Sequence, residues 1–204
     1  RHNKLERRDR LIMVNYPNGQ KVVKPSEQQI NHSRANMGMQ LEHDVIISCN
    51  FYKDQNRALI YKRPTPIKVC KMDKNNRTHI TDAYFDEKST TDFNGIYRQK
   101  YLDFECKETI KDALTLSKIR PQQIRHLRQV QELGGLAFFV VRFKAYNETY
   151  LLDAKYILDA QSKTFKRSFF MENGVLIKPG FQPRLYLLEA VDEEYFNVEV
   201  QKVS

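Results

Sequence analysis

The chain has 204 residues, 41% of them hydrophobic, and carries a formal net charge of +9. This composition supports one folded domain and argues against global disorder. No segment approaches the ~18 consecutive apolar residues of a membrane span, and no apolar signal stretch follows the basic N-terminus, so we expect a cytoplasmic protein with no membrane partner. The excess of cations favours an anionic partner such as nucleic acid, with generic solubility as the alternative.

The cysteines and histidines give no metal-binding or disulfide pattern. Cys49, Cys70 and Cys106 are scattered and include no CxxC pair. An odd, scattered set predicts reduced cysteines in the core of a cytosolic protein. The five histidines are equally scattered and lack the spacing of a zinc site.

The first third of the chain divides at about residue 33. Residues 1–33 are polar and basic with little periodicity, which predicts a flexible basic arm before a folded domain at 34–204; an inert tail is the alternative. Ser33 can cap a helix that runs to about Lys53. Apolar side chains at helical spacing predict the buried stripe of this helix: Met37, Leu41, Val45, Cys49 and Tyr52.

A short apolar strand at 58–61 ends at a segment with two prolines, which marks an exit from the sheet. Two strand-like runs follow, at 67–70 and 78–81, separated by a polar and basic tip. We therefore expect an inserted β-hairpin within about residues 67–85. Contact of its basic tip with nucleic acid is one interpretation, and an ordinary surface hairpin is the other.

The next two runs, 89–97 and 101–109, contain the candidate chemistry. Side chains alternate between the two faces of a strand, so four polar residues share one face: Tyr101, Asp103, Glu105 and Lys107. Thr90 and Asp92 share a face if their run is extended, and Asn94-Gly95 indicates a turn. Two carboxylates that share a divalent cation, beside an ammonium group, are what phosphodiester hydrolysis needs. Asp92, Glu105 and Lys107 are thus candidate catalytic residues, with a surface ion pair of the last two as the alternative.

The second half of the chain predicts further elements. Pro121 suits the first position of a helix that buries Ile124, Leu127 and Val130, ends at 134–135, and has His126 on or near an outer face. Strands are expected at 135–141 and 149–152, a helix at 154–160, and an edge strand at 183–188. Taken together, the order of elements predicts an α/β fold with a mixed sheet.

These elements, with Asp92 followed by Glu105-Cys106-Lys107, resemble the PD-(D/E)xK nuclease superfamily, which implies a restriction-endonuclease-like mixed sheet flanked by helices. More specific sequence motifs resemble those of the RecU-type Holliday junction resolvases across about residues 14–190. Six segments carry this resemblance: residues 16–19, 38–42, 62–66, 83–85, 89–97 and 103–109.

The resemblance implies roles for individual residues. It implies four residues around a Mg²⁺ ion, with Mn²⁺ as a substitute: Thr90, Asp92, Glu105 and Gln123. Oxygen donors of this kind suit magnesium. Lys107 would orient the attacking water or stabilise the transition state. Glu42 is a candidate residue near the metal, and a solvated carboxylate is the alternative. For Gln123, the interpretation that does not depend on the resemblance is a helix residue that faces solvent. Asp103 and Glu108 are interpreted as bystanders.

The resemblance also implies a symmetric homodimer that makes paired nicks in four-way DNA junctions during homologous recombination and DNA repair. The hairpin would be a stalk that enters the junction, and the arm would contact DNA. Five cations are candidate DNA contacts: Lys62, Arg63, Lys71, Lys74 and Arg77. Two alternatives stay open, a restriction-like duplex endonuclease and a non-catalytic protein that binds junctions or modulates a recombinase. A recombinase is also a candidate partner.

Overall fold

The computed structural model describes residues 39–76, 78–85, 90–115, 117 and 119–197. The predicted arm at 1–33, the cap at Ser33 and the first residue of the buried stripe, Met37, lie outside the described residues. So does Arg77 in the hairpin tip.

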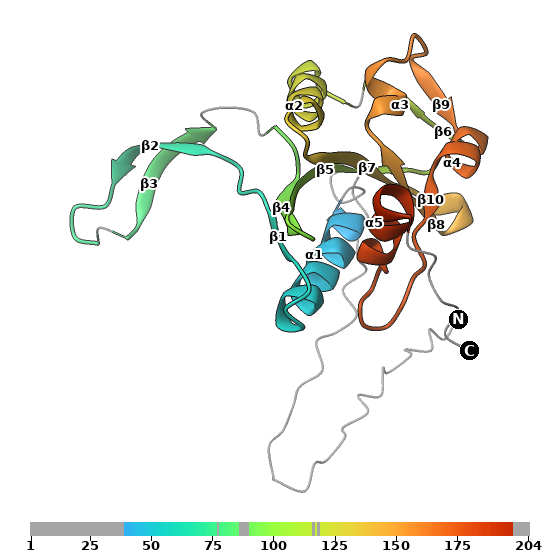
Figure 1. Cartoon of the computed structure of the whole chain (residues 1–204). Coiled ribbons are helices and arrows are strands. Elements are labelled where there is room, and N and C mark those ends of the chain that lie inside the picture. The colour runs from blue at the N-terminus through green and yellow to red at the C-terminus, as the bar shows by residue number, and fades with distance from the viewer. Residues whose placement is uncertain (1–38, 77, 86–89, 116, 118, 198–204) are drawn as a thin grey trace, which may run out of the picture. The chain divides into compact units, whose positions relative to one another are not determined.

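The centre of the fold is a six-stranded sheet with the order β1-β4-β5-β7-β8-β10 (Figure 1). Its strands are β1 (Leu59–Lys62), β4 (Phe93–Tyr97), β5 (Lys100–Thr109), β7 (Leu136–Phe143), β8 (Glu148–Asp153) and β10 (Val175–Leu176). β5 and β7 pair in parallel, and the other neighbours pair antiparallel. The predicted mixed sheet is therefore confirmed.

In the described part of the chain, five α-helices accompany the sheet: α1 (Met39–Asp54), α2 (Pro121–Glu132), α3 (Lys155–Leu158), α4 (Arg167–Asn173) and α5 (Leu187–Phe196). They bury apolar side chains in two clusters, one that includes α1 and α5 and another that includes α2, α3 and α4. Alternate residues of β7 enter the two clusters, so the sheet lies between them. Within the described part of the chain, no helix is long and apolar enough to cross a membrane.

Helix α1 is held by the predicted stripe. Leu41, Val45, Cys49 and Tyr52 are all buried, and they pack against the face of β5 formed by Leu102, Phe104 and Cys106. Stacked aromatic rings continue this layer across the strands, with the Phe104 and Phe138 ring centroids 4.7 Å apart. The opposite face of β5 is thereby left to the polar residues.

The inserted hairpin consists of β2 (Ile67–Met72) and β3 (Ile80–Phe85), which form a separate two-stranded sheet (Figure 1). Every side chain of β2 is exposed. The prediction of a core position for Cys70 is therefore wrong, whereas Cys49 and Cys106 are buried, and all three are free thiols. A second small sheet joins β6 (Ala113–Thr115) to β9 (Thr164–Lys166).

The predicted turn at Asn94-Gly95 is wrong, because both residues lie inside β4. The chain reverses instead at Arg98 and Gln99, which have φ values of 45° and 61°. Gly95 is required for another reason: a Cβ at this position would lie 2.1 Å from the carbonyl oxygen of Leu59 on β1. This glycine permits the close approach of two strands.

The expected edge strand at 183–188 is also wrong. Leu185 makes one isolated bridge to Pro179, and the chain then enters α5 at Leu187. The Tyr52 hydroxyl of α1 donates a hydrogen bond to the Leu185 carbonyl at 3.1 Å. Packing against α1 therefore decides the conformation of this segment, because its apolar spacing fits either a strand or the start of a helix.

Candidate active site

The structure brings the predicted pair of carboxylates to one place. Phe93 lies opposite Phe104 in the β4–β5 register, so Asp92, one position before β4, lies level with Glu105. The Asp92 carboxylate accepts a hydrogen bond from the Cys106 backbone N–H at 2.9 Å. This contact fixes the Asp92 side chain beside the strand that carries Glu105.

Glu105 is 1% exposed, and its Oε1 contacts the Lys107 ammonium. The other oxygen, Oε2, is buried without a hydrogen-bond partner among the described residues. Burial and then the Asp92 charge raise the pKa of Glu105 from 4.5 to about 7, while Lys107 and Gln123 oppose this rise. The ion pair considered as the alternative does form, but its predicted surface location is wrong, because the Glu105 carboxylate lies inside the protein.

Thr90 supplies a second unsatisfied oxygen. Its Oγ1 is buried and has no hydrogen-bond partner within the described residues. Buried polar atoms nearly always have a partner, and two such oxygens beside a carboxylate pair fit a bound cation. Neutral and anionic oxygens together fit a hard divalent cation. In the described ranges, no group of three or more His, Cys, Asp or Glu side chains is placed so that it could hold a metal ion, so neutral ligands such as Thr90 would have to complete the set.

Gln123 lies in the first turn of α2 and is 5% exposed, so its interpretation as a solvent-facing residue is wrong. Its Oε1 accepts a hydrogen bond from the Arg120 backbone N–H at 2.9 Å. The amide oxygen therefore closes the start of the helix, while the side chain is close enough to Glu105 to lower the pKa of that carboxylate.

Glu42 reaches the site indirectly. Its carboxylate pairs with the Lys62 ammonium, which lies 5.3 Å from the centroid of the Phe93 ring. Burial lowers the pKa of Lys62, but the hydrogen bond and charge of Glu42, followed by the charge of Asp92, outweigh it, and the pKa is raised. The Lys62 ammonium thus interacts electrostatically with both the Glu42 and the Asp92 carboxylates.

Asp103, interpreted from the sequence as a bystander, is fully buried. Among the described residues its carboxylate has four side-chain partners: Thr91, Arg63, Tyr101 and His126. Arg63 additionally donates its backbone N–H to the Asp92 carbonyl at 2.7 Å. Strand alternation identifies the face of Asp103, but no local pattern reveals partners 40 and 23 residues away.

Glu108 faces the other side of β5, where its side chain is 2% exposed. The Lys144 ammonium lies 3.2 Å and the Arg142 guanidinium 3.8 Å from its carboxylate. Arg142 also pairs with Asp44 of α1 at 2.7 Å. This charged group belongs to the packing of α1 and lies on the opposite face from Glu105.

The cations predicted to contact DNA fall into two groups. The side chains of Lys62 and Arg63 are engaged in ion pairs with Glu42 and Asp103. Lys71 and Lys74 are exposed on the hairpin, and no ion pair involves either within the described residues.

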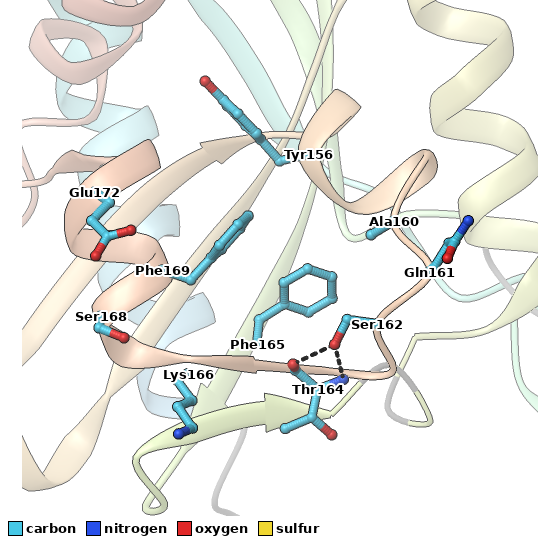
Figure 2. Close-up of a pocket in the computed structure, with 10 residues that line it drawn as sticks. All are labelled: Tyr156, Ala160, Gln161, Ser162, Thr164, Phe165, Lys166, Ser168, Phe169 and Glu172. Carbon is cyan, nitrogen blue, oxygen red and sulfur yellow. Dashed lines mark hydrogen bonds between the residues drawn. The ribbon is translucent and has the colours of Figure 1, made fainter.

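A separate hollow of about 490 Å³ lies between α3, β9 and α4 (Figure 2). The rings of Tyr156, Phe165 and Phe169 line it, and Ser162 and Thr164 hydrogen-bond to each other at its edge. None of the predicted site residues lines this hollow, and Glu172 is the one carboxylate among the residues that do. The hollow lacks a pair of carboxylates such as Asp92 and Glu105.

The family model and the relatives found by sequence point to one family. The family model "RecU: Recombination protein U" matches residues 36–193. A Holliday junction resolvase RecU of Oceanobacillus iheyensis is 40% identical over 196 residues, which cover 90% of this chain and all of the relative. That of Geobacillus kaustophilus is 41% identical over 172 residues, covering 79% of this chain and 86% of the relative. The solved structure of Hjc, a Holliday junction resolvase from Archaeoglobus fulgidus, is 13% identical in sequence and has a TM-score of 0.42. The match covers 68% of this chain and 89% of the Hjc chain.

Proposed function

This chain belongs to the RecU family, and from that premise we propose that it resolves Holliday junctions during homologous recombination and DNA repair. It is an endonuclease that hydrolyses phosphodiester bonds in four-way DNA junctions. The observation that carries the proposal is the buried Glu105 carboxylate, which lies level with Asp92, contacts Lys107 and has one oxygen without a hydrogen-bond partner among the residues that the structure describes. Family membership favours this function over the restriction-like and non-catalytic alternatives.

The reaction needs a divalent cation, which we propose is Mg²⁺, with Mn²⁺ as a substitute. The proposed ligands are Asp92, Glu105, Thr90 and Gln123, and the unsatisfied oxygens of Thr90 and Glu105 support this set. The Gln123 amide oxygen already accepts a hydrogen bond from the Arg120 N–H, and its second lone pair can face a cation. When bound, the cation makes a water more acidic and offsets the charge that builds up on the phosphate.

The residues around the proposed ligands have separate tasks. Lys107 lies two residues from Glu105 on the same face of β5, and its side chain is 20% exposed, so the ammonium can reach a phosphate oxygen from the solvent side. Glu105 must be ionised to act as a ligand, and the Lys107 ammonium favours that ionised form. Glu42 acts through Lys62, whose positive charge faces Asp92.

The DNA contacts and the assembly are part of the same proposal. Lys71 and Lys74 on the exposed hairpin would contact phosphates, with the residues at 1–33 as a further DNA-binding arm on the nuclease domain. A symmetric homodimer would present two sites for paired nicks. A recombinase stays a predicted partner, and a chromosomal DNA substrate favours a cytoplasmic location.

The direct test incubates the protein with four-way junctions and with matched linear duplexes, with and without Mg²⁺. We expect paired symmetric cuts in the junction alone, and only with the metal. Asp92→Asn should abolish cutting and leave junction binding in place, because Asp92 faces Glu105 and is itself a proposed metal ligand. Cleavage confined to linear duplex, or tight junction binding without cuts by the wild type, would contradict the proposal.

A further inference from the structure

We propose that Asp103 is a positioning residue of the active site, whose carboxylate fixes the segment with Asp92, the helix with Gln123 and the base of the hairpin relative to Glu105. This inference rests on the proposed function. We call Asp103 with Thr91, Arg63, Tyr101 and His126 the Asp103 cluster. Its carboxylate is completely buried two residues before Glu105, on the same face of β5.

The first link runs to the segment before β4. Asp103 Oδ1 accepts a hydrogen bond from the Thr91 hydroxyl, and Thr91 is the residue between Thr90 and Asp92. Both neighbours are proposed metal ligands. Holding the residue between them restricts where their side chains lie relative to β5.

The second link runs to the base of the hairpin. Arg63 lies between β1 and β2, and its guanidinium donates to Asp103 Oδ2 at 2.6 Å. The same residue donates its backbone N–H to the Asp92 carbonyl. Arg63 therefore fixes Asp92 and the start of the hairpin to one buried anion.

The third link runs to α2. The His126 ring lies 2.9 Å from Asp103 Oδ2 through its Nε2. His126 follows Gln123 by three residues, so both lie on the same side of the helix. The contact sets the rotation of α2 and with it the distance between Gln123 and Glu105.

A purely structural role for Asp103 is the competing explanation, and the chain offers a matched control for it. Asp192 on α5 is also a buried carboxylate that accepts from a tyrosine and an arginine. The Tyr97 hydroxyl lies at 2.9 Å and the Arg98 Nε at 2.8 Å. Among the described residues, Asp192 has no contact with the proposed metal ligands, so its loss removes similar interactions without disturbing the site.

The experiment compares Asp103→Asn and Asp192→Asn with the wild type. Calorimetric titration with Mn²⁺ alone, without DNA, gives the metal affinity, and junction cleavage gives kcat and KM. We expect Asp103→Asn to lose about 10–100-fold in Mn²⁺ affinity and in kcat, the usual effect of removing a partner of metal ligands, with KM changed little. Asp192→Asn should keep both values within about threefold at a temperature where each variant is folded.

Equal Mn²⁺ affinity and kcat in the two variants would overturn the inference and leave the proposed function intact, whereas an inactive wild type would count against the function itself. If Asp103→Asn does not fold, His126→Ala decides, because it removes one link and leaves the carboxylate paired with Arg63. Weaker Mn²⁺ binding in His126→Ala, restored in His126→Gln with its N–H donor, supports the positioning role. Unchanged binding in His126→Ala contradicts it.

Discussion

Asp103 and Glu105 are two buried carboxylates on the same face of one strand, yet their surroundings differ. Asp103 has partners on both oxygens, whereas Glu105 Oε2 has none among the described residues. A carboxylate with satisfied oxygens holds its neighbours in place, because every partner loses a bond if it moves. A buried carboxylate with an unsatisfied oxygen costs stability, and such a cost is typical of a binding site.

The largest expected effect is the loss of catalysis when Glu105 is substituted. Glu105→Gln removes the anionic ligand while preserving shape, so junction cleavage should fall by about 10³-fold or more. Junction binding should stay near the wild-type level in a gel-shift measurement. Glu108→Gln is the control, since it neutralises a buried carboxylate on the other face of β5. Near-normal cleavage by Glu105→Gln would remove Glu105 from the proposed ligands.

The next effect is on the stability of the metal-free protein, where substitutions of Asp103 and Glu105 should change the free energy of unfolding in opposite directions. Asp103→Asn leaves Arg63 without its anion, and we expect a loss of about 3 kcal/mol in the free energy of unfolding. Glu105→Gln removes an unfavourable buried charge and should keep or raise that free energy. Urea denaturation with a chelator present measures both, and destabilisation of equal size in the two variants would contradict the comparison.

The pH dependence sharpens the same point. The pKa of Glu105 is raised from 4.5 to about 7 in the folded protein, so folding favours the protonated form. Stability from this group is fully present below pH 4.5 and is lost as pH rises through about 7. The free energy of unfolding lost over this pH range is roughly 3 kcal/mol, at 1.36 kcal/mol per pKa unit. Denaturation of metal-free wild type between pH 5 and 8 should show this decline, and Glu105→Gln should not.

The smallest effect belongs to Gln123. Its oxygen caps α2 in this structure, so it is the proposed ligand with the weakest support. We expect Gln123→Ala to reduce Mn²⁺ affinity by about 10-fold, at the lower end of the range for residues around a metal. A loss as large as that of Glu105→Gln in parallel calorimetric titrations would show that the Gln123 amide oxygen binds the cation directly.

The sequence predicted the features that depend on local spacing. Strand alternation placed Glu105 and Lys107 on one face, and helical spacing gave the buried stripe of α1, because each pattern needs only neighbouring residues. The Asp103 cluster joins residues far apart in the chain, so no local pattern could reveal it. Asn94-Gly95 failed as a turn because Gly95 is needed for packing against β1. Segment 183–188 failed because contacts with α1 decide its conformation.

The central claim is that a divalent cation binds between Asp92 and Glu105. Anomalous diffraction from crystals soaked in Mn²⁺ tests it most directly, since the metal itself is located. The account predicts one strong peak in contact with carboxylate oxygens of both residues in the wild type, and none there in Glu105→Gln crystals. A wild-type peak elsewhere, with nothing between these two carboxylates, would contradict it.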